Sequence, residues 1–502
     1  MANWHRLTEA RIRKAEAEGT LSGLAGEGRL LPERPGDALI DPSDAVGYRI
    51  MAEAGALPEE ITLKARLDAA RADWQAATIE ADKRRHMARI ADLQMRYEIA
   101  RDARRKFLRQ APAPAALRLD PGPSEAVLAP AMTGPRYPDL IARLPATVPF
   151  TGPEEIERVQ GHPFRARLGA NENVYGPSPK ALTAMQAADA EIWKYADPSH
   201  LDLKTEISTR MGCRPANIVF GEGIDGCLGN LVRLLVAPGD PVVTSEGAYP
   251  TFAYHVNGYG GTLHKVPYRD DHEDIAALFA KAAEVDAKIV YLSNPDNPMG
   301  TWHDGATIEA ALEDLPDGTV LALDEAYIEF APEGTAPRID PEDPRVIRFR
   351  TFSKAYGMAG ARVGYAVAAA PLISAFDKVR NHFSMNRSAQ HGALAALQDE
   401  VWLGELREKI TVANERIATI AAANGLATVP TSTNFVAVDC GHDGAFAKRV
   451  LEGLARRGVF VRMPGVAPLD RCIRVSAGTG PDLDILAEEL PKALAEASAP
   501  VA

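Results

Sequence analysis

Five short apolar segments between residues 216 and 354 each end in a polar or glycine-rich turn, and this recurrence constrains the fold more than any other feature. The segments are ANIVFGEG, DPVVTSEGAYP, AKIVYLSNP, TVLALDEAY and RVIRFRTFSK, and helix-like stretches lie between most of them. Apolar strands that alternate with helices are typical of βαβ units and a mainly parallel sheet. Such sheets bind ligands at the carboxyl ends of their strands, so we expect functional residues directly after each segment.

The chain as a whole is too long for one ordinary core. Its 502 residues indicate two or three domains. Residues 111–135 are rich in Ala and Pro without a periodic pattern, which predicts a semi-rigid linker. Before the linker, residues 1–110 have the pattern of a small helical module. Met87, Ile90, Leu93 and Tyr97 recur at three- and four-residue steps and predict one helix face.

The charge is distributed unevenly along the chain. The formal net charge is −12, yet residues 1–110 hold 20 Lys+Arg against 18 Asp+Glu. The acidic remainder argues against a nucleic-acid partner there. Residues 81–110 hold ten basic and four acidic side chains. A basic helix of this kind can contact RNA, although a solvated helix face is the favoured interpretation.

The cysteines and the N-terminal segment indicate the cellular compartment in which the protein is located. The four cysteines form no CxxC pair, which disfavours a zinc site and a disulfide framework and favours a reducing cytoplasm. The N-terminal segment is charged and lacks the apolar core of a secretory signal. The longest weakly apolar run, near VGYAVAAAPLISAF, is too short to cross a bilayer. We therefore expect a soluble cytoplasmic protein with no membrane segment and no metal site.

Two of the strand ends carry side chains that suit a bound ligand. Asp324 ends an apolar strand, where an unpaired carboxylate is costly and calls for a cationic partner, and Tyr327 follows three residues later. In IVYLSNPDNPMG, a rigid turn after a strand can direct the amide of Asn297 at a ligand oxygen. Taken alone, each of these features fits a plain structural role equally well or better.

The segment TFSKAYGMAGARVGY adds a third set of groups. Thr351, Ser353 and the following glycine-containing segment could bind a phosphate, and Arg362 adds a fork of donors suited to it. Burial and a neighbouring cation disfavour the ammonium form of Lys354, which makes it a candidate Schiff-base nucleophile. An acid for a ring nitrogen, an Asn and a Tyr for a phenolic oxygen, and a lysine for an aldehyde together describe one cofactor, pyridoxal phosphate.

At this point the chain resembles a known family. DEAYIEF, NPDNPMG and TFSKAYGMAGARVGY, in this order, resemble class I/II aminotransferases of fold type I, and most nearly the histidinol-phosphate aminotransferases. RLGANENVYGPSP, KYADPSH and CIRVSAGT support the resemblance, which covers roughly residues 136–498. It implies an α/β large domain with a mostly parallel sheet over about residues 170–385. A small α/β domain would then come from residues 136–169 and 386–498.

The resemblance also implies a role for individual residues. Lys354 would bind the cofactor covalently, Asp324 would pair with its ring nitrogen, and Asn297 and Tyr327 would hydrogen-bond its phenolic oxygen. The remaining implied contacts are ring stacking by Tyr249, phosphate binding by Glu222, Gly223, Thr351, Ser353 and Arg362, carboxylate binding by Arg474, and substrate contacts by Arg462, Tyr175 and Asn173. Tyr195 would reach the phosphate in a neighbouring subunit, because the sites of this family lie at a dimer interface.

The implied reaction is transamination by a homodimer. The amino donor would be histidinol phosphate or an aromatic amino acid, and the acceptor 2-oxoglutarate. The chain departs from the family pattern at Val174, at Met299, in the loop GEGIDG, and at Asp470 and Arg471 within MPGVAPLDRCI. Because substrate contacts come from these regions, decarboxylation of an amino acid phosphate, as in relatives of threonine-phosphate decarboxylase, stays open as an alternative.

The N-terminal module has a resemblance of its own. RIRKAEAEGTLSGLAGEGRLLP, followed by GYRIMAEAGALPEEI, resembles the conserved domain of DnaJ-homologue subfamily C proteins over roughly residues 5–75. The His-Pro-Asp signature of a J-domain does not occur in this module. A protein- or RNA-binding adaptor is the alternative function that this module suggests.

Overall fold

The computed structural model describes residues 135–146 and 150–499, together with five helical residues nearer the N-terminus: Ala70, Lys83, His86, Met87 and Leu93. The chain divides into two compact units, Met1–Pro130 and Ala131–Ala502, at a point within the predicted linker. Of the predicted helix face, Ile90 and Tyr97 lie outside the described residues, as does most of the predicted N-terminal module.

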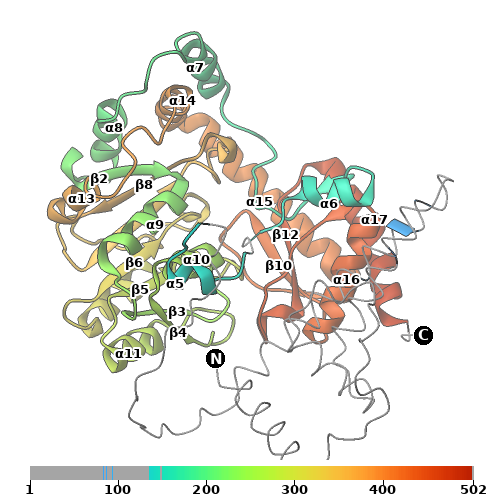
Figure 1. The fold of residues 1–502 in the computed structure, drawn as a ribbon. Helices are drawn as coiled ribbons and strands as arrows, with labels where there is room; N and C mark the ends of the chain where they lie inside the picture. Colours follow the sequence, from blue (N-terminus) through green and yellow to red (C-terminus); the bar gives the residue numbers. More distant parts are fainter. Residues whose placement is uncertain are drawn as a thin grey trace, which may run out of the picture. The chain divides into compact units, whose positions relative to one another are not determined.

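A seven-stranded sheet forms the centre of the larger lobe of the second unit (Figure 1). Its strand order is β2-β8-β7-β6-β5-β3-β4. The strands are β2 (Ile218–Glu222), β3 (Pro241–Ser245), β4 (Thr262–Val266), β5 (Ile289–Ser293), β6 (Val320–Asp324), β7 (Val346–Thr351) and β8 (Val363–Ala368). The five adjacent strands β4, β3, β5, β6 and β7 run parallel to one another. Strand β8 runs antiparallel to both of its neighbours, β2 and β7. The prediction of a mainly parallel α/β sheet is thus confirmed.

Helices cover both faces of this sheet. Alternate strand residues pack into different clusters: Tyr291 of β5 lies with α9 and α10, whereas its neighbours Val290 and Leu292 lie with α11 and α12. Strands buried on both faces read as continuous apolar runs, as in β5 and β6. The helices of this lobe are α7 (Pro179–Asp189), α8 (Leu201–Met211), α9 (Gly223–Leu235), α10 (Pro250–Tyr259), α11 (Ile275–Val285), α12 (Gly305–Ala311), α13 (Ala370–Phe376) and α14 (Arg387–Leu397).

All five predicted apolar segments contain strands, whereas β4 and β8 had not been predicted. β4 lies at the sheet edge, where only part of its surface is covered, and its sequence TLHKV is accordingly mixed in polarity. β8 is fully buried, but its run VGYAVA leads within two residues into α13. A short apolar run next to a helix cannot be assigned from periodicity alone.

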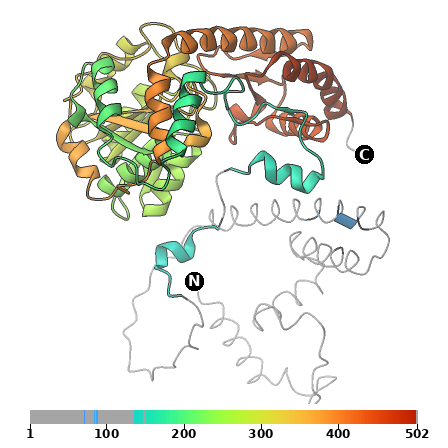
Figure 2. The same ribbon diagram turned by 90° about the horizontal axis from the view of Figure 1, so that it is seen from above.

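The smaller lobe contains an antiparallel sheet of order β12-β10-β9. Its strands are β9 (Ala427–Thr428), β10 (Phe435–Asp439) and β12 (Cys472–Ser476), and β1 (Ala166–Arg167) pairs separately with β11 (Val459–Phe460). Its helices include α15 (Glu400–Ala423), α16 (Gly444–Arg456) and α17 (Gly480–Ser498), and two short helices precede β1, α5 (Asp139–Arg143) and α6 (Pro153–Gln160). In both views α15 runs from the larger lobe to the smaller one (Figures 1 and 2).

Single turns of 3-10 helix complete the described part of the chain. They are η2 (Pro215–Asn217), η3 (Leu312–Asp314), η4 (Ile328–Phe330), η5 (Ala359–Ala361) and η6 (Leu469–Arg471). In the described ranges, no helix combines the length and the apolar character that a membrane crossing requires.

The position of α14 bears on the domain boundary predicted at residue 385. Its buried residues, among them Ala389 and Ala393, share a core cluster with Phe220 of β2 and Tyr365 of β8. This packing joins α14 to the larger lobe and favours a boundary nearer residue 400.

A buried ion cluster supports the end of β6. Glu325 is fully buried, and its carboxylate contacts Arg348 at 2.7 Å and Arg350 at 2.9 Å. Burial alone would raise the pKa of Glu325, but the two arginines outweigh it and hold that pKa below its usual value. The residue directly before this cluster is Asp324, so the cluster holds the backbone at the point where the candidate site begins.

We predict that Glu325→Ala lowers the free energy of unfolding by about 3–5 kcal/mol, because it leaves two largely buried guanidinium groups without their carboxylate. Urea unfolding of the full chain, followed by tryptophan fluorescence, measures this change. The control is Glu405→Ala, which removes a 4.0 Å contact with Lys409 between exposed side chains. The control should change the free energy by less than about 0.5 kcal/mol. Equal effects of the two substitutions would contradict the prediction.

Candidate active site

A cavity of about 290 Å³ lies at the carboxyl ends of β5, β6 and β7. Ten of the predicted site residues line it: Tyr249, Asn297, Asp324, Tyr327, Thr351, Ser353, Lys354, Arg362, Arg462 and Arg474. They come from segments far apart in the sequence. The segments that follow the strands of the large sheet bring eight of them to one edge of that sheet, and Arg462 and Arg474 come from the smaller lobe.

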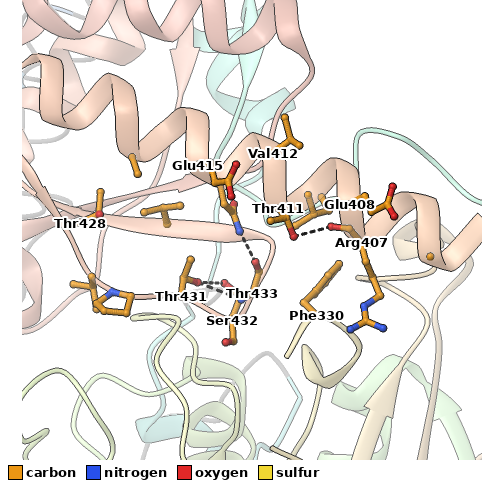
Figure 3. Close-up of a pocket in the computed structure, with 17 residues that line it drawn as sticks. Phe330, Arg407, Glu408, Thr411, Val412, Glu415, Thr428, Thr431, Ser432 and Thr433 are labelled. Atoms are coloured by element: carbon orange, nitrogen blue, oxygen red, sulfur yellow. Dashed lines mark hydrogen bonds between the residues drawn. The ribbon is translucent and has the colours of Figure 1, made fainter. Parts of the chain in front are cut away.

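A larger groove, of about 920 Å³, lies elsewhere, between α15 and the loop before β10 (Figure 3). It contains none of the predicted site residues. Several of its polar groups bond to one another: the hydroxyls of Thr431 and Thr433 are 2.9 Å apart, and the Asn414 amide donates to the Thr433 carbonyl at 2.8 Å. The buried acids and bases converge instead in the smaller cavity, which is therefore the candidate active site.

Asp324 forms the inner end of the cavity. Its carboxylate accepts hydrogen bonds from the Tyr291 hydroxyl at 2.6 Å and from the Ala326 N–H at 2.9 Å. Burial raises the pKa of Asp324 to about 6, and these two hydrogen bonds limit the rise. Sequence reasoning missed Tyr291, because a tyrosine within an apolar strand reads as a core residue.

Lys354 lies near the middle of the cavity. Its Nζ donates to the Asn171 carbonyl oxygen at 3.2 Å and lies 5.6 Å from the centre of the Tyr327 ring. Burial, together with the nearby charge of Arg474, lowers the pKa of Lys354 to about 8. Deprotonation of this amine is therefore easier than that of an exposed lysine.

Asn171 organises the groups around the lysine and was also missed. Its backbone has a φ of 52°, its amide donates to the Tyr327 hydroxyl at 2.9 Å, and its carbonyl also accepts from the Asn434 amide at 3.0 Å. The predicted residue of the same stretch, Asn173, lies outside the cavity lining and donates to the Lys354 carbonyl at 3.1 Å. The stretch ANEN, residues 170–173, indicated an asparagine at the site. The sequence does not show which of its two asparagines lies next to the lysine.

Donor groups converge at the outer end of the cavity. Arg362 donates to the Ser353 hydroxyl at 3.3 Å and to the Glu222 carbonyl at 3.2 Å, and Thr351 donates to Ser353 at 2.9 Å. Helix α9 begins here at Gly223, and no described side chain caps it. Hydroxyls, a guanidinium and a helix N-terminus form a suitable environment for an anion.

Close packing in this region restricts residue 223 to glycine. Gly223 has a φ of +73°, and a Cβ there would lie 2.2 Å from Nη2 of Arg362. The Gly223 N–H donates to the Arg362 carbonyl at 3.1 Å.

The first-turn amides of Ile224 and Asp225 have no acceptor within the helix, because the first four N–H groups of a helix lack one.

Tyr249 forms a flat wall of the cavity. Its ring stacks on Phe150, with centroids 6.1 Å apart and planes inclined by 27°. Its hydroxyl donates to Asp225 at 2.9 Å, and the other oxygen of Asp225 lies 3.5 Å from Arg362. Asp225 and Phe150 were not predicted, since an acid in a first helical turn usually serves the helix itself.

Two arginines from the smaller lobe complete the cavity. Arg474 donates to the side-chain oxygen of Asn297, its guanidinium lies 5.2 Å from the Phe435 ring, and its buried Nε has no partner among the described residues. Arg462 donates to the Thr151 carbonyl at 2.8 Å. The orphaned Nε leaves Arg474 with donor capacity for a further ligand.

Five predicted site residues are absent from the cavity lining: Glu222, Gly223 and Asn173, whose contacts are given above, and Tyr175 and Tyr195. The Tyr175 hydroxyl donates to the Gly478 carbonyl at 3.2 Å. Tyr195 is 80% exposed, and its ring lies 4.7 Å from that of Phe383. Tyr195 is thus available to contact something outside this chain.

The residues present fit pyridoxal phosphate on the chemistry of their donors. A carboxylate at the inner end suits a protonated ring nitrogen, Lys354 suits the aldehyde, and the convergent donors at the outer end suit the phosphate. The flat wall of Tyr249 suits the face of the ring.

Comparison with known proteins agrees with this geometry. The family model described as aminotransferase class I and II matches residues 166–490. The chain belongs to the class I and II aminotransferases. As a member of this family it is a pyridoxal-phosphate-dependent aminotransferase, which confirms the predicted fold type, cofactor and reaction class. A second family model, the conserved domain of DnaJ homologue, subfamily C, member 28, matches residues 7–75, which confirms the resemblance of the N-terminal module.

Individual relatives are histidinol-phosphate aminotransferases. The enzyme of Moorella thermoacetica is 34% identical over 354 residues, which cover 70% of this chain and 91% of that protein. Histidinol-phosphate aminotransferase 2 of Ralstonia nicotianae is 36% identical over 336 residues, which cover 66% of this chain and 90% of that protein. Among solved structures, the histidinol-phosphate aminotransferase of Sinorhizobium meliloti in complex with pyridoxal-5'-phosphate has 50% identity and a TM-score of 0.69, covering 72% of this chain and 98% of that one.

We predict that Tyr291→Phe shifts the acidic limb of the kcat/KM profile to higher pH. The Tyr291 hydroxyl stabilises the ionised form of Asp324 and so lowers its pKa; without the hydroxyl, that pKa rises above about 6. The loss of one hydrogen bond to a charged group corresponds to a shift of about one pH unit. Tyr365→Phe, at a buried tyrosine of β8 outside the cavity lining, is the control. An unchanged acidic limb in Tyr291→Phe would contradict this assignment.

Proposed function

We propose that the amino donor of this aminotransferase is histidinol phosphate, with an aromatic amino acid as the other favoured donor, and that its acceptor is 2-oxoglutarate. The observation that carries the proposal is the pair of guanidinium groups, Arg462 and Arg474, on one side of the cavity that contains Lys354. Their backbones are joined by two hydrogen bonds, of 3.2 and 2.6 Å, so the two side chains belong to one local unit. The names of the relatives support the choice of donor.

Two cations in one cavity suit substrates that carry anions at a distance from the reacting carbon. Arg474 would bind the carboxylate next to the reacting carbon, since its Nε is buried and unpartnered among the described residues. Arg462 would bind the distal carboxylate of 2-oxoglutarate. Histidinol phosphate has no carboxylate, and its single phosphate would instead be the anion that this pair of arginines binds. Burial lowers the pKa of Arg462, but a guanidinium stays charged at neutral pH.

Lys354 would move the proton during the reaction. Bound pyridoxal phosphate supplies an electron sink that acidifies the substrate carbon. Burial and the nearby charge of Arg474 lower the pKa of Lys354 to about 8, which favours the neutral amine that can accept that proton. Its ammonium form can then return the proton. Asp324, held ionised by Tyr291, would keep the ring nitrogen protonated throughout.

We propose a homodimer whose interface includes the segment after α7. Large apolar side chains are exposed there: Ile192 is 57%, Trp193 77% and Tyr195 80% exposed, and Phe383 packs beside Tyr195. A cluster of exposed apolar groups of this size is typical of a contact surface. In a two-fold dimer Tyr195 would lie against the partner subunit, in agreement with its predicted contact to the neighbouring phosphate.

The cytoplasm is the proposed location. All four cysteines, Cys213, Cys227, Cys440 and Cys472, lie in the described ranges and are free thiols. Free buried thiols are the usual state in a reducing compartment.

A donor screen tests the function. Purified protein reconstituted with pyridoxal phosphate should show the absorbance band of a lysine-bound cofactor, and a true amino donor should bleach it. We predict that histidinol phosphate bleaches the band and that 2-oxoglutarate restores it, whereas Lys354→Ala shows neither response, because no other described amine lines the cavity. Bleaching by aromatic amino acids alone would reassign the donor. Release of carbon dioxide, or no bound chromophore in the wild type, would overturn the proposal.

The proposed dimer has a separate test. We predict that Trp193→Asp shifts the sedimentation of the full chain from dimer to monomer and lowers cofactor affinity, because a buried, unpaired carboxylate disfavours the interface. Val159→Asp is the control, at a residue of α6 that is 70% exposed. A wild type that sediments as a monomer, or a Trp193→Asp variant that stays dimeric, would contradict the proposed interface.

A further inference from the structure

Arg471 connects the two lobes outside the active-site cavity. Its Nη2 contacts the Asp271 carboxylate of the larger lobe at 2.7 Å, and its Nε contacts Asp439 at the end of β10 at 2.7 Å. Its remaining terminal nitrogen donates to the Pro468 carbonyl at 3.1 Å. The three charged side chains are only about a quarter exposed, at 26%, 21% and 27%. The guanidinium is thus held in one orientation by three acceptors.

The acceptor on the larger lobe is itself held firmly. Asp271 lies in a tight turn closed by two backbone hydrogen bonds between Arg269 and His272, of 2.9 and 3.0 Å. The Asp271 carbonyl accepts from the Thr301 hydroxyl at 2.8 Å. Thr301 directly follows the turn that carries Asn297. The carboxylate of Asp271 is therefore tied to a segment that lines the active site.

The Arg471–Asp271 contact lies close in sequence to a second contact between the lobes, which is made inside the cavity. Arg471 directly precedes β12, and Arg474 lies three residues later within that strand. Arg474 makes its own contact across the lobes, to the side chain of Asn297. Two neighbouring arginines of the smaller lobe thus reach the same part of the larger lobe, one inside the cavity and one outside it.

The two contacts stand in different relation to a bound substrate. Arg474 lines the cavity and has an unpartnered Nε, so a substrate carboxylate would bind to the same guanidinium that contacts Asn297. Arg471 does not line the cavity, so a substrate bound there would leave its contact with Asp271 in place. The Arg471–Asp271 contact would thus hold the start of β12 against the larger lobe whether or not the site is filled.

We propose that Arg471 is a positioning residue: together with Asp271 it clamps the start of β12 to the larger lobe and so holds Arg474 at the working distance from Lys354. The part of this inference that concerns the substrate carboxylate rests on the proposed function. A partly exposed ion pair contributes little to global stability, so loss of the clamp acts on the placement of Arg474 rather than on folding.

Steady-state kinetics of the reconstituted full chain test the clamp. In Arg471→Met and in Asp271→Asn, the KM for 2-oxoglutarate should rise about tenfold while kcat changes less than about threefold, the size expected for coupled charged contacts. The double variant should resemble Arg471→Met alone, because that substitution already removes the contact with Asp271. Arg471→Lys should recover part of the loss, since an ammonium can still reach one carboxylate.

Arg167→Met is the matched control. Arg167 also binds two carboxylates, Glu154 at 2.7 Å and Glu157 at 2.6 Å, but all three residues belong to the segment that precedes the larger lobe and do not bridge to it. Its KM should match that of the wild type. A fall in kcat without a rise in KM, additive effects of the two clamp substitutions, or an equal rise in Arg167→Met would overturn the proposal.

Hydrogen–deuterium exchange of the same proteins gives a readout that does not depend on activity. Backbone amides of residues 269–272 and 472–476 should exchange faster in Arg471→Met than in the wild type, and at the wild-type rate in Arg167→Met. Unchanged exchange in Arg471→Met would overturn the clamp. If the wild type proved inactive with every donor, the proposed function would fail, whereas exchange would still decide whether the clamp exists.

Discussion

The carboxylate of Asp324 is the group on which the site depends, because it ends a strand buried on both faces. An ionised acid in that position needs donors, and the Tyr291 hydroxyl and the Ala326 amide supply them. Directly behind it, Glu325 is held by Arg348 and Arg350. The inner end of the cavity is thus a set of compensated charges that must form together, and it is the place that a cationic ring nitrogen would suit.

The two lobes supply different parts of the chemistry. The larger lobe provides the groups that suit the cofactor, since they follow the strands of its sheet. The smaller lobe provides Arg462 and Arg474, which suit the substrates. Asn171, near the join, contacts both Tyr327 of the larger lobe and Ser476 of the smaller. The proposed substrate contacts would therefore depend on how the lobes meet, whereas the proposed cofactor contacts come mainly from one sheet.

Much of this arrangement could be predicted from sequence, for a physical reason. Strand alternation and the rule for carboxyl ends place Asp324, Asn297 and Lys354 at one edge, because local patterns determine which residues end strands. Tyr291, Asn171 and Asp225 could not be predicted in the same way. Each acts through contacts made with residues distant in the sequence, and each occupies a position where a structural role is the ordinary interpretation. The pairing of Arg471 with Asp271, 200 residues apart, is invisible in sequence for the same reason.

The glycine at position 223 has a consequence for redesign of this enzyme. A side chain there would overlap the Arg362 guanidinium, and one at Gly364 would lie 2.3 Å from the Gly223 backbone. A larger residue at either glycine therefore requires the Arg362 side chain or the Gly223 backbone to move. A search that changes one residue at a time would therefore find few substitutions of these glycines that leave the surroundings of Arg362 intact.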